Sequence, residues 1–132
     1  MNMLGSLRTI VQEVNSARNL PEVLRIIVTE VRAAMQAGVC SVYLFDETDQ
    51  RYVLTATKGL REESIGKVRL AMREGLVGLV AAKEEPLNLE DADQHPNFAY
   101  FEETGESPFH SFLGVPIIHH RKVLGVLVLQ QQ

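Results

Sequence analysis

The feature that most constrains this chain is its last stretch, which consists of two nearly all-apolar segments joined by a short basic turn. This stretch runs from His110 to Leu129. Apolar runs of this length, rich in Val and Ile and bounded by polar residues, are typical of strands that are covered on both faces. The sequence therefore predicts a pair of central strands, with other parts of the chain packed on each side.

The composition limits the class of protein. With 132 residues, of which 45% are hydrophobic, the chain is long enough to bury a sizeable core as one domain. A net charge of −4 argues against a nucleic-acid or membrane-surface partner, because those partners are bound by clustered Lys and Arg. Apolar runs fall short of the roughly 20 residues that cross a bilayer. The single cysteine, Cys40, has no partner for an internal disulfide, so we expect a cytoplasmic protein.

Two amphipathic helices are predicted near the start of the chain. The first is short, ends near Asn15, and has apolar residues at spacings of three and four: Leu7, Ile10, Val11 and Val14. The second begins after Asn19, which is expected to form a variant capping box with Glu22. Its apolar face runs from Leu20 to Met35, and Gly38 is expected to follow its end.

Short strands and loops occupy the middle of the chain. The predicted strands are Val39–Phe45, Arg51–Thr57, Val68–Met72 and Pro86–Leu89. Leu76–Lys83 is ambiguous between helix and strand, and we favour a helix. Together with the final pair, this order predicts an α+β domain with a central antiparallel sheet of five to six strands. The two N-terminal helices would cover one face, and short helices and loops would cover the other, where a pocket is expected.

Several stretches in this order resemble the GAF domain, a family of small-molecule-sensing modules related in architecture to PAS domains. They are Cys40–Asp46 on the first strand, Glu74–Val80 at the short helix, Leu89–Phe98 in the long loop and Leu113–Ile117 on the fifth strand. The whole chain is also similar to the N-terminal GAF domain of enzyme I of the bacterial nitrogen phosphotransferase system, a phosphoenolpyruvate-protein phosphotransferase. The stretches that carry this narrower resemblance are Met3–Val14, Val39–Leu44, Thr55–Leu60, Phe112–Ile118 and Leu124–Val128.

The resemblance implies a regulatory module that senses a small metabolite and controls an attached phosphotransferase. It implies glutamine or 2-oxoglutarate as the ligand. We also expect a homodimer, because the predicted helices carry apolar stripes. In the full-length enzyme it implies phosphoenolpyruvate and Mg as cofactors, a phosphocarrier protein as partner, and a catalytic histidine outside residues 1–132. The alternative is a ligand-free dimerisation and docking module, in which the apolar stripes of the two predicted helices pair between chains.

A GAF sheet is followed by a helix that packs beside the first helices, and the resemblance implies that the chain stops just short of it. We therefore expect residues 1–132 to be a single GAF domain cut from a longer protein. One face of the final strand should then lose its cover. Strand alternation gives two candidate sets: Leu124, Val126 and Val128 on one face, or Val123, Leu127 and Leu129 on the other.

Position by position, the resemblance places seven residues around the ligand pocket: Ser41, Tyr43, Thr57, Leu76, Val77, Ala99 and Glu103. Strand alternation independently predicts that Ser41 and Tyr43 share one face of the sheet, opposite Cys40. Thr57 and Ala99 differ from the residues that cyclic-nucleotide-binding members of the family carry, which argues against a cyclic nucleotide as the ligand.

Other chemistries have less support in the sequence. Cys40 lies on an apolar strand and is expected to pack as a small hydrophobe rather than to act as a redox thiol. His119 and His120 are adjacent and lack a third ligand in sequence reach, so we expect solvated turn residues rather than a metal site. Gly75–Gly78 lacks the Lys-Ser or Lys-Thr of a phosphate loop, although a helix that begins there offers amide donors to an anionic ligand. Because no acid-base or nucleophilic constellation stands out, no enzymatic activity is expected within residues 1–132.

Overall fold

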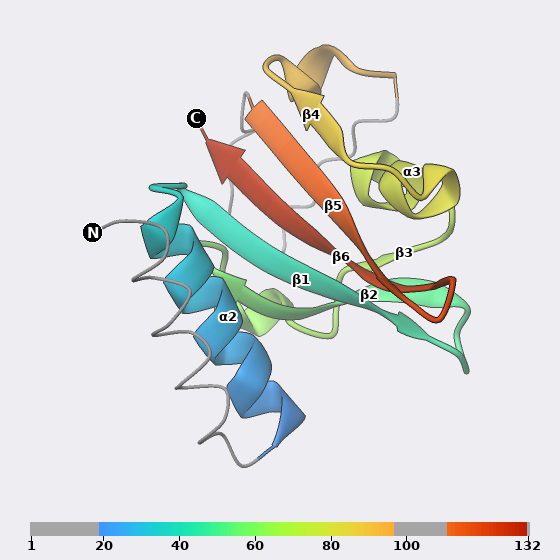
Figure 1. Ribbon diagram of the computed structural model, residues 1–132, viewed down its shortest axis with the longest axis horizontal. Coiled ribbons are helices and arrows are strands. Elements are labelled where there is room, and N and C mark those ends of the chain that lie inside the picture. The colour runs from blue at the N-terminus through green and yellow to red at the C-terminus, as the bar shows by residue number, and fades with distance from the viewer. Residues whose placement is uncertain (1–18, 97–110, 132) are drawn as a thin grey trace.

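The computed structural model describes residues 19–96 and 111–131, and within them one six-stranded antiparallel sheet forms the centre of the domain (Figure 1). The strands are β1 (Val39–Asp46), β2 (Arg51–Lys58), β3 (Arg69–Leu70), β4 (Leu87–Leu89), β5 (Ser111–His119) and β6 (Lys122–Gln131). Their order across the sheet is β3-β2-β1-β6-β5-β4. The helices are α2 (Leu20–Ala34) and α3 (Gly75–Lys83), with short 3-10 turns η1 (Glu62–Ser64) and η2 (Ala92–Gln94). The α+β class and the antiparallel sheet are confirmed, and the first predicted helix lies outside the described residues.

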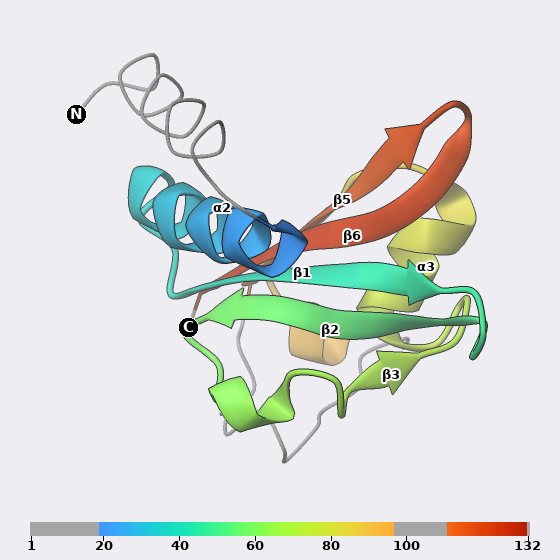
Figure 2. The same cartoon turned by 90° about the horizontal axis from the view of Figure 1, so that it is seen from below.

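Helix α2 begins as the sequence predicts. The Asn19 side chain accepts a hydrogen bond from the backbone N–H of Glu22 at 3.0 Å, which satisfies a donor in the first turn. The helix ends at Ala34, and Arg32 Nε then donates to the carbonyl of Gly38 at 2.9 Å, directly before β1. Figure 2 shows α2 lying across one face of the sheet, over β1 and β2.

The two faces of the sheet carry separate apolar clusters, because side chains alternate along β1. On one face, Cys40 and Val42 pack with Leu24 and Val28 of α2. The cluster on the opposite face joins the sheet to α3 and includes Val39, Tyr43, Leu54, Leu76, Val77, Val80, Val126 and Val128. Leu76–Lys83 is therefore a helix, as favoured from the sequence, and it packs on the face away from α2.

The final strand pair is internal in the sheet order, as predicted, but its cover is incomplete. Strand β6 lies between β1 and β5, whereas the outer neighbour of β5 is the three-residue strand β4. Val115 is 36% exposed and Ile118 47% exposed, so the expectation that both faces are covered fails along β5. The turn between the strands places His120 and Arg121 at positive φ, which is typical of a tight hairpin.

An irregularity in β6 changes which side chains share a face. Ile117 pairs with Gly125 and Ile118 pairs with Val123, so Leu124 is an extra residue in the strand. Val123 consequently packs with the α3-side cluster, and the prediction that placed it with Leu127 is wrong. Val126 and Val128 on the α3 side are buried. Leu127 and Leu129 on the α2 side are half-buried, and Leu124 of the first set is 40% exposed, so each predicted set has members that lack full cover.

Candidate functional site

Ser41 and Thr57 form a buried polar pair in the centre of the predicted pocket region. They lie opposite each other in the register of β1 and β2, and their side-chain oxygens are 2.9 Å apart. Ser41 is 0% exposed and Thr57 is 6% exposed. The two hydroxyls satisfy each other within a predominantly apolar layer, which a buried polar group requires.

Tyr43, Leu76 and Val77 belong to one buried cluster on the α3 face. Because residues two apart on a strand share a face, Ser41 lies on the same side of β1 as Tyr43, as the alternation predicts. The structure thus gathers the five described members of the predicted lining on the α3 side of the sheet. Ala99 and Glu103 lie outside the described residues.

Two glycines position α3 against this face. Gly75 begins the helix with φ at +64°, a backbone conformation that favours glycine. Gly78 sits so close to the preceding loop that a Cβ there would collide with the carbonyl oxygen of Ala71 and lie 2.9 Å from the backbone nitrogen of Arg73. The glycine spacing therefore serves a turn and a close helix contact. Glu74, before the helix, accepts a hydrogen bond from the backbone N–H of Ala71 at 3.0 Å.

One end of β2 borders a cavity of about 300 Å³ that touches the predicted site at Thr57. Its other walls come from the start of α2, with Pro21 and Arg25, and from Glu62 and Ile65 around η1. Its lining therefore combines apolar side chains with one positive and two negative or polar groups at Arg25, Glu62 and Thr57.

The opposite end of the same strands borders a second cavity, of about 320 Å³, which the sequence did not indicate. It is lined by Phe45 and Tyr52 of the β1–β2 hairpin, by the end of α3 at Glu84, and by Arg121 in the β5–β6 turn. These residues come from three separate parts of the sequence. Only the folded sheet brings them together, so no local motif could have revealed the site.

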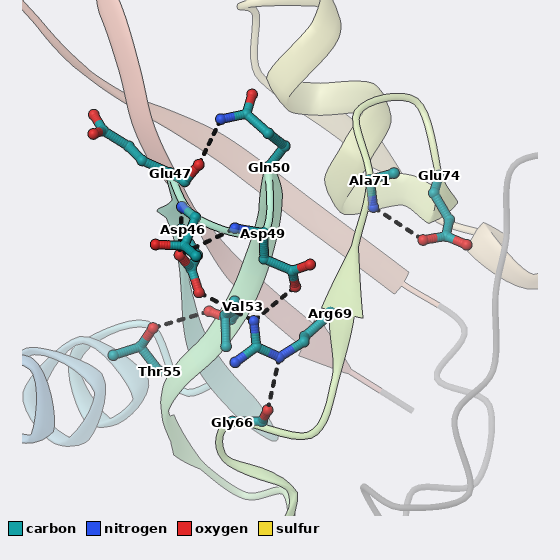
Figure 3. Close-up of polar contacts among 11 residues, drawn as sticks. Asp46, Glu47, Asp49, Gln50, Val53, Thr55, Gly66, Arg69, Ala71 and Glu74 are labelled. Atoms are coloured by element: carbon teal, nitrogen blue, oxygen red, sulfur yellow. Dashed lines mark hydrogen bonds and ion pairs between the residues drawn. The ribbon is translucent and has the colours of Figure 1, made fainter.

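The acidic turn after β1 holds an ion-pair network (Figure 3). Arg69 Nη1 lies 3.1 Å from Asp46 Oδ2 and 2.7 Å from Asp49 Oδ2, and Arg69 Nε donates to the Gly66 carbonyl. The hydrogen bond from Arg69 is the main cause that holds the pKa of Asp46 below its ordinary value, and backbone N–H groups of Thr48 and Asp49 contribute further. All three charged side chains are about one-third exposed. The network fixes the turn against β3, and it offers no acid-base pair for catalysis.

Cys40 is buried against α2, as predicted, and burial raises the pKa of its thiol to about 12. The thiol therefore stays protonated at neutral pH and behaves as a small hydrophobe. His119 and His120 are exposed at the hairpin turn with their rings 3.9 Å apart, which matches the predicted solvated pair. Among the described residues, no helix is both long and apolar enough to span a membrane.

Comparison with known proteins identifies the family to which this fold belongs. Residues 19–132 match the GAF domain family. This chain is a GAF domain. Over 121 residues it is 51% identical to the phosphoenolpyruvate-dependent phosphotransferase system proteins of Escherichia coli K12 and Salmonella typhimurium. That match covers 92% of this chain and 16% of each relative, so the GAF domain corresponds to a small part of those proteins.

Solved structures agree with this assignment. The GAF domain of a phosphoenolpyruvate-protein phosphotransferase from Coxiella burnetii superposes with a TM-score of 0.92 at 48% identity, covering 99% of this chain and 78% of that one. The corresponding Acinetobacter domain gives 0.87 at 51% identity, with the same coverage. A free methionine-R-sulfoxide reductase from Neisseria meningitidis gives 0.80 at 21% identity, covering 96% of this chain and 71% of that one. At that identity the likeness shows the GAF fold alone.

Proposed function

We propose that this GAF domain is the regulatory module of a phosphoenolpyruvate-protein phosphotransferase of the nitrogen-related phosphotransferase system. The observation that carries the proposal is the pair of GAF domains from such phosphotransferases that match at 48% and 51% identity over nearly the whole chain. The full-length cytoplasmic enzyme would use phosphoenolpyruvate and Mg and pass the phosphoryl group to a phosphocarrier protein. Its catalytic histidine would lie outside this domain.

The regulatory signal in this proposal is a small metabolite, glutamine or 2-oxoglutarate, bound on the α3 side of the sheet. The Ser41 and Thr57 hydroxyls supply polar contacts at the floor, and Tyr43, Leu76 and Val77 supply apolar walls. Ala99 and Glu103 would complete the lining from the long segment before β5. A ligand there competes for the Ser41–Thr57 hydrogen bond and pushes against α3. The helix then has two states, with and without the ligand, and the ligand favours one of them.

The size of the response follows from linkage. A ligand shifts a two-state equilibrium only by its difference in affinity for the two states, typically about 1–3 kcal/mol. Such a difference corresponds to roughly 5- to 150-fold in an equilibrium constant, which is enough to regulate flux through an attached enzyme.

Isothermal titration calorimetry of the chain with glutamine and with 2-oxoglutarate tests the ligand. We expect one of the two to bind, and Ser41→Ala and Val77→Phe to weaken that binding by changing a polar contact and a wall of the site. Ser111→Ala changes a more exposed hydroxyl on β5 and should leave binding unchanged. Absence of heat with both metabolites at concentrations on the order of 10 mM would remove them as ligands.

Phosphotransfer from phosphoenolpyruvate, measured on the full-length enzyme with and without the bound metabolite, tests regulation. The expected result is a metabolite-dependent rate that disappears in the Ser41→Ala enzyme. A rate that ignores the metabolite although the metabolite binds would contradict regulation while leaving the ligand site in place.

The ligand-free dimerisation module stays the alternative because apolar side chains remain accessible on the α2 side. Val23, Ile27 and Val31 of α2 are half-buried, and Val115 of β5 is 36% exposed on the same side of the sheet. Pairing of these faces between two chains would form the proposed homodimer. Analytical ultracentrifugation across a concentration series distinguishes this function, which predicts a dimer in the absence of any metabolite.

A further inference from the structure

The cavity at the tip of the β1–β2 hairpin has a floor of apolar side chains. Phe45 and Tyr52 face each other across β1 and β2 with ring centroids 5.1 Å apart, and Met72 and Val123 also line the space. Met72 is 54% exposed although it is apolar. The volume of about 320 Å³ lies at the lower end of the range for small-molecule sites, about 300–1,000 Å³.

This cavity is separate from the site of the proposed metabolite. Phe45 and Ser41 are four residues apart on β1, which is about 13 Å at the rise of a strand. The predicted lining residues Ser41, Tyr43 and Thr57 contribute nothing to its walls.

Tyr52 brings a buried hydroxyl to the cavity, and none of the residues that the structure describes forms a hydrogen bond with it. The residue is only 2% exposed; its side chain belongs to the α3-side cluster, its ring lies tilted against that of Phe45, and the charge of Glu84 acts on its hydroxyl. Buried tyrosine hydroxyls normally find a hydrogen-bond partner. Burial first, and the Glu84 carboxylate second, raise the pKa of Tyr52, so its O–H is a neutral donor at physiological pH.

Opposite charges stand on two walls of the cavity without neutralising each other. Glu84 ends α3 in the left-handed conformation, with φ at 56°, and Arg121 occupies the β5–β6 turn with φ at 63°. Both side chains are exposed, and neither forms an ion pair or a side-chain hydrogen bond within the part of the chain that the structure describes. The neighbouring Lys122 is already engaged, with its Nζ 3.2 Å from Glu47. As far as the described residues go, the cavity therefore offers one cation and one anion that have no ion-pair partner.

We propose that this cavity is a second ligand site, specific for a small zwitterion of the α-amino acid type that carries an apolar side chain. Arg121 binds the carboxylate and Glu84 binds the ammonium group. The Tyr52 hydroxyl donates a hydrogen bond to the ligand. The apolar side chain of the ligand packs on Phe45 and Met72. A simple anion would meet the charge of Glu84 and a simple amine would meet that of Arg121, whereas a zwitterion satisfies both walls.

The probe is L-phenylalanine, titrated into ¹⁵N-labelled chain while amide chemical shifts are recorded. We expect saturable shifts centred on Phe45, Glu84 and Arg121, with Ser41 and Thr57 unmoved. No saturable shift at concentrations on the order of 10 mM would overturn the proposal. Shifts centred on Ser41 and Thr57 would also overturn it, because they would place the amino acid in the other site.

Two analogues separate recognition of the charges from simple filling of an apolar hollow. N-acetyl-L-phenylalanine lacks the ammonium group and L-phenylalaninamide lacks the carboxylate, so each should bind about tenfold more weakly than L-phenylalanine. Glu84→Gln should weaken L-phenylalanine about tenfold but should not weaken N-acetyl-L-phenylalanine, because it removes a charge that repels this anion. Arg121→Gln should likewise weaken L-phenylalanine about tenfold but should not weaken L-phenylalaninamide. Equal binding of all three compounds to all variants would refute the zwitterion site.

Matched controls remove the same charges next to or away from the cavity. Glu85→Gln follows Glu84 directly, and Arg61→Gln lies before η1; both residues are exposed and neither lines the cavity. Both controls should bind L-phenylalanine like the unmodified chain, and a weakening equal to that of the site variants would contradict the assignment. Tyr52→Phe tests the hydroxyl alone. Because this site does not depend on the proposed regulatory function, loss of glutamine or 2-oxoglutarate binding in Ser41→Ala leaves it untouched.

Discussion

The side-chain oxygens of Ser41 and Thr57 lie 2.9 Å apart in the buried middle of the sheet, on strands that pair directly. Each hydroxyl is the partner of the other, within a layer made mainly of aliphatic and aromatic side chains. The pair is therefore a structural element of the apo domain as well as the polar floor of the proposed metabolite site. A ligand that forms a hydrogen bond with one of these hydroxyls must also provide a hydrogen-bond partner for the other.

Ser41→Ala should destabilise the domain, because it leaves the Thr57 hydroxyl buried without a partner. The expected loss in the free energy of unfolding, measured by urea denaturation, is about 1–3 kcal/mol. The double variant Ser41→Ala/Thr57→Val removes both hydroxyls and should recover part of that loss. Ser111→Ala, whose hydroxyl makes a long exposed bond of 3.4 Å to Gln131, should change stability by less than about 0.5 kcal/mol. A double variant less stable than the sum of the single changes would contradict this account.

Gly78→Ala should destabilise the domain although alanine is the better helix former. In an open helix the change would stabilise by about 1 kcal/mol. Here the added methyl group collides with the Ala71 carbonyl, so α3 must move off the loop at an expected cost of about 1–3 kcal/mol. The reverse change at a half-exposed position of the same helix, Ala82→Gly, should cost about 1 kcal/mol. Thermal unfolding of both variants checks the prediction, and a stabilised Gly78→Ala chain would rule out the close contact.

Arg69→Gln should remove an acid-sensitive contribution to stability. The pKa of Asp46 lies below its ordinary value of 3.8 in the folded state, chiefly because Arg69 donates to it. The stabilisation is therefore present above that ordinary value and is lost as the pH falls through the lowered pKa. The difference in urea midpoint between the unmodified chain and the variant should be largest near pH 7, shrink at pH 3, and shrink in high salt.

Lys122→Gln is the control for the Arg69 prediction. Its ion pair with Glu47 has a similar distance of 3.2 Å, but both side chains are well exposed, at 61% and 76%. Exposed single pairs contribute little, so this variant should show almost no pH-dependent difference. An equal effect in both variants would mean that the geometry around Arg69 adds nothing.

The sequence predicts the fold where a local signal and a tertiary role coincide. The Asn19 cap, the α2 apolar face and the alternation around Ser41 and Tyr43 each follow from spacing alone, and all are present. The reversal of Val123 could not be read from alternation, because the extra residue Leu124 is set by the pairing of β6 with β5. A one-residue change in register moves every later side chain to the other face.

The two candidate sites also differ in how far the sequence predicts them. Ser41 and Thr57 could be chosen because the resemblance to the GAF family places both at the pocket, and the hairpin register brings them together. The cavity of Tyr52, Glu84 and Arg121 could not, because each residue alone is an ordinary strand, helix-end or turn residue. Its chemistry arises only when the start of β2, the end of α3 and the β5–β6 turn converge.

Cys40 gives a prediction at the alkaline end of the pH range. Burial raises its pKa from 9.0 to about 12, so the unfolded chain loses the thiol proton at a lower pH than the folded chain. The contribution of the Cys40 thiol to the free energy of unfolding is fully present below pH 9. It is lost as the pH rises towards 12, at about 1.4 kcal/mol per pH unit. Urea denaturation between pH 8 and pH 10.5 should therefore show a steeper loss of stability for the unmodified chain than for Cys40→Ala.

The reactivity of the Cys40 thiol gives a second measurement of its burial. In the folded chain the thiol should resist a chromogenic disulfide reagent at pH 8 and react fully once urea unfolds the domain. Rapid reaction before unfolding would contradict its place in the core.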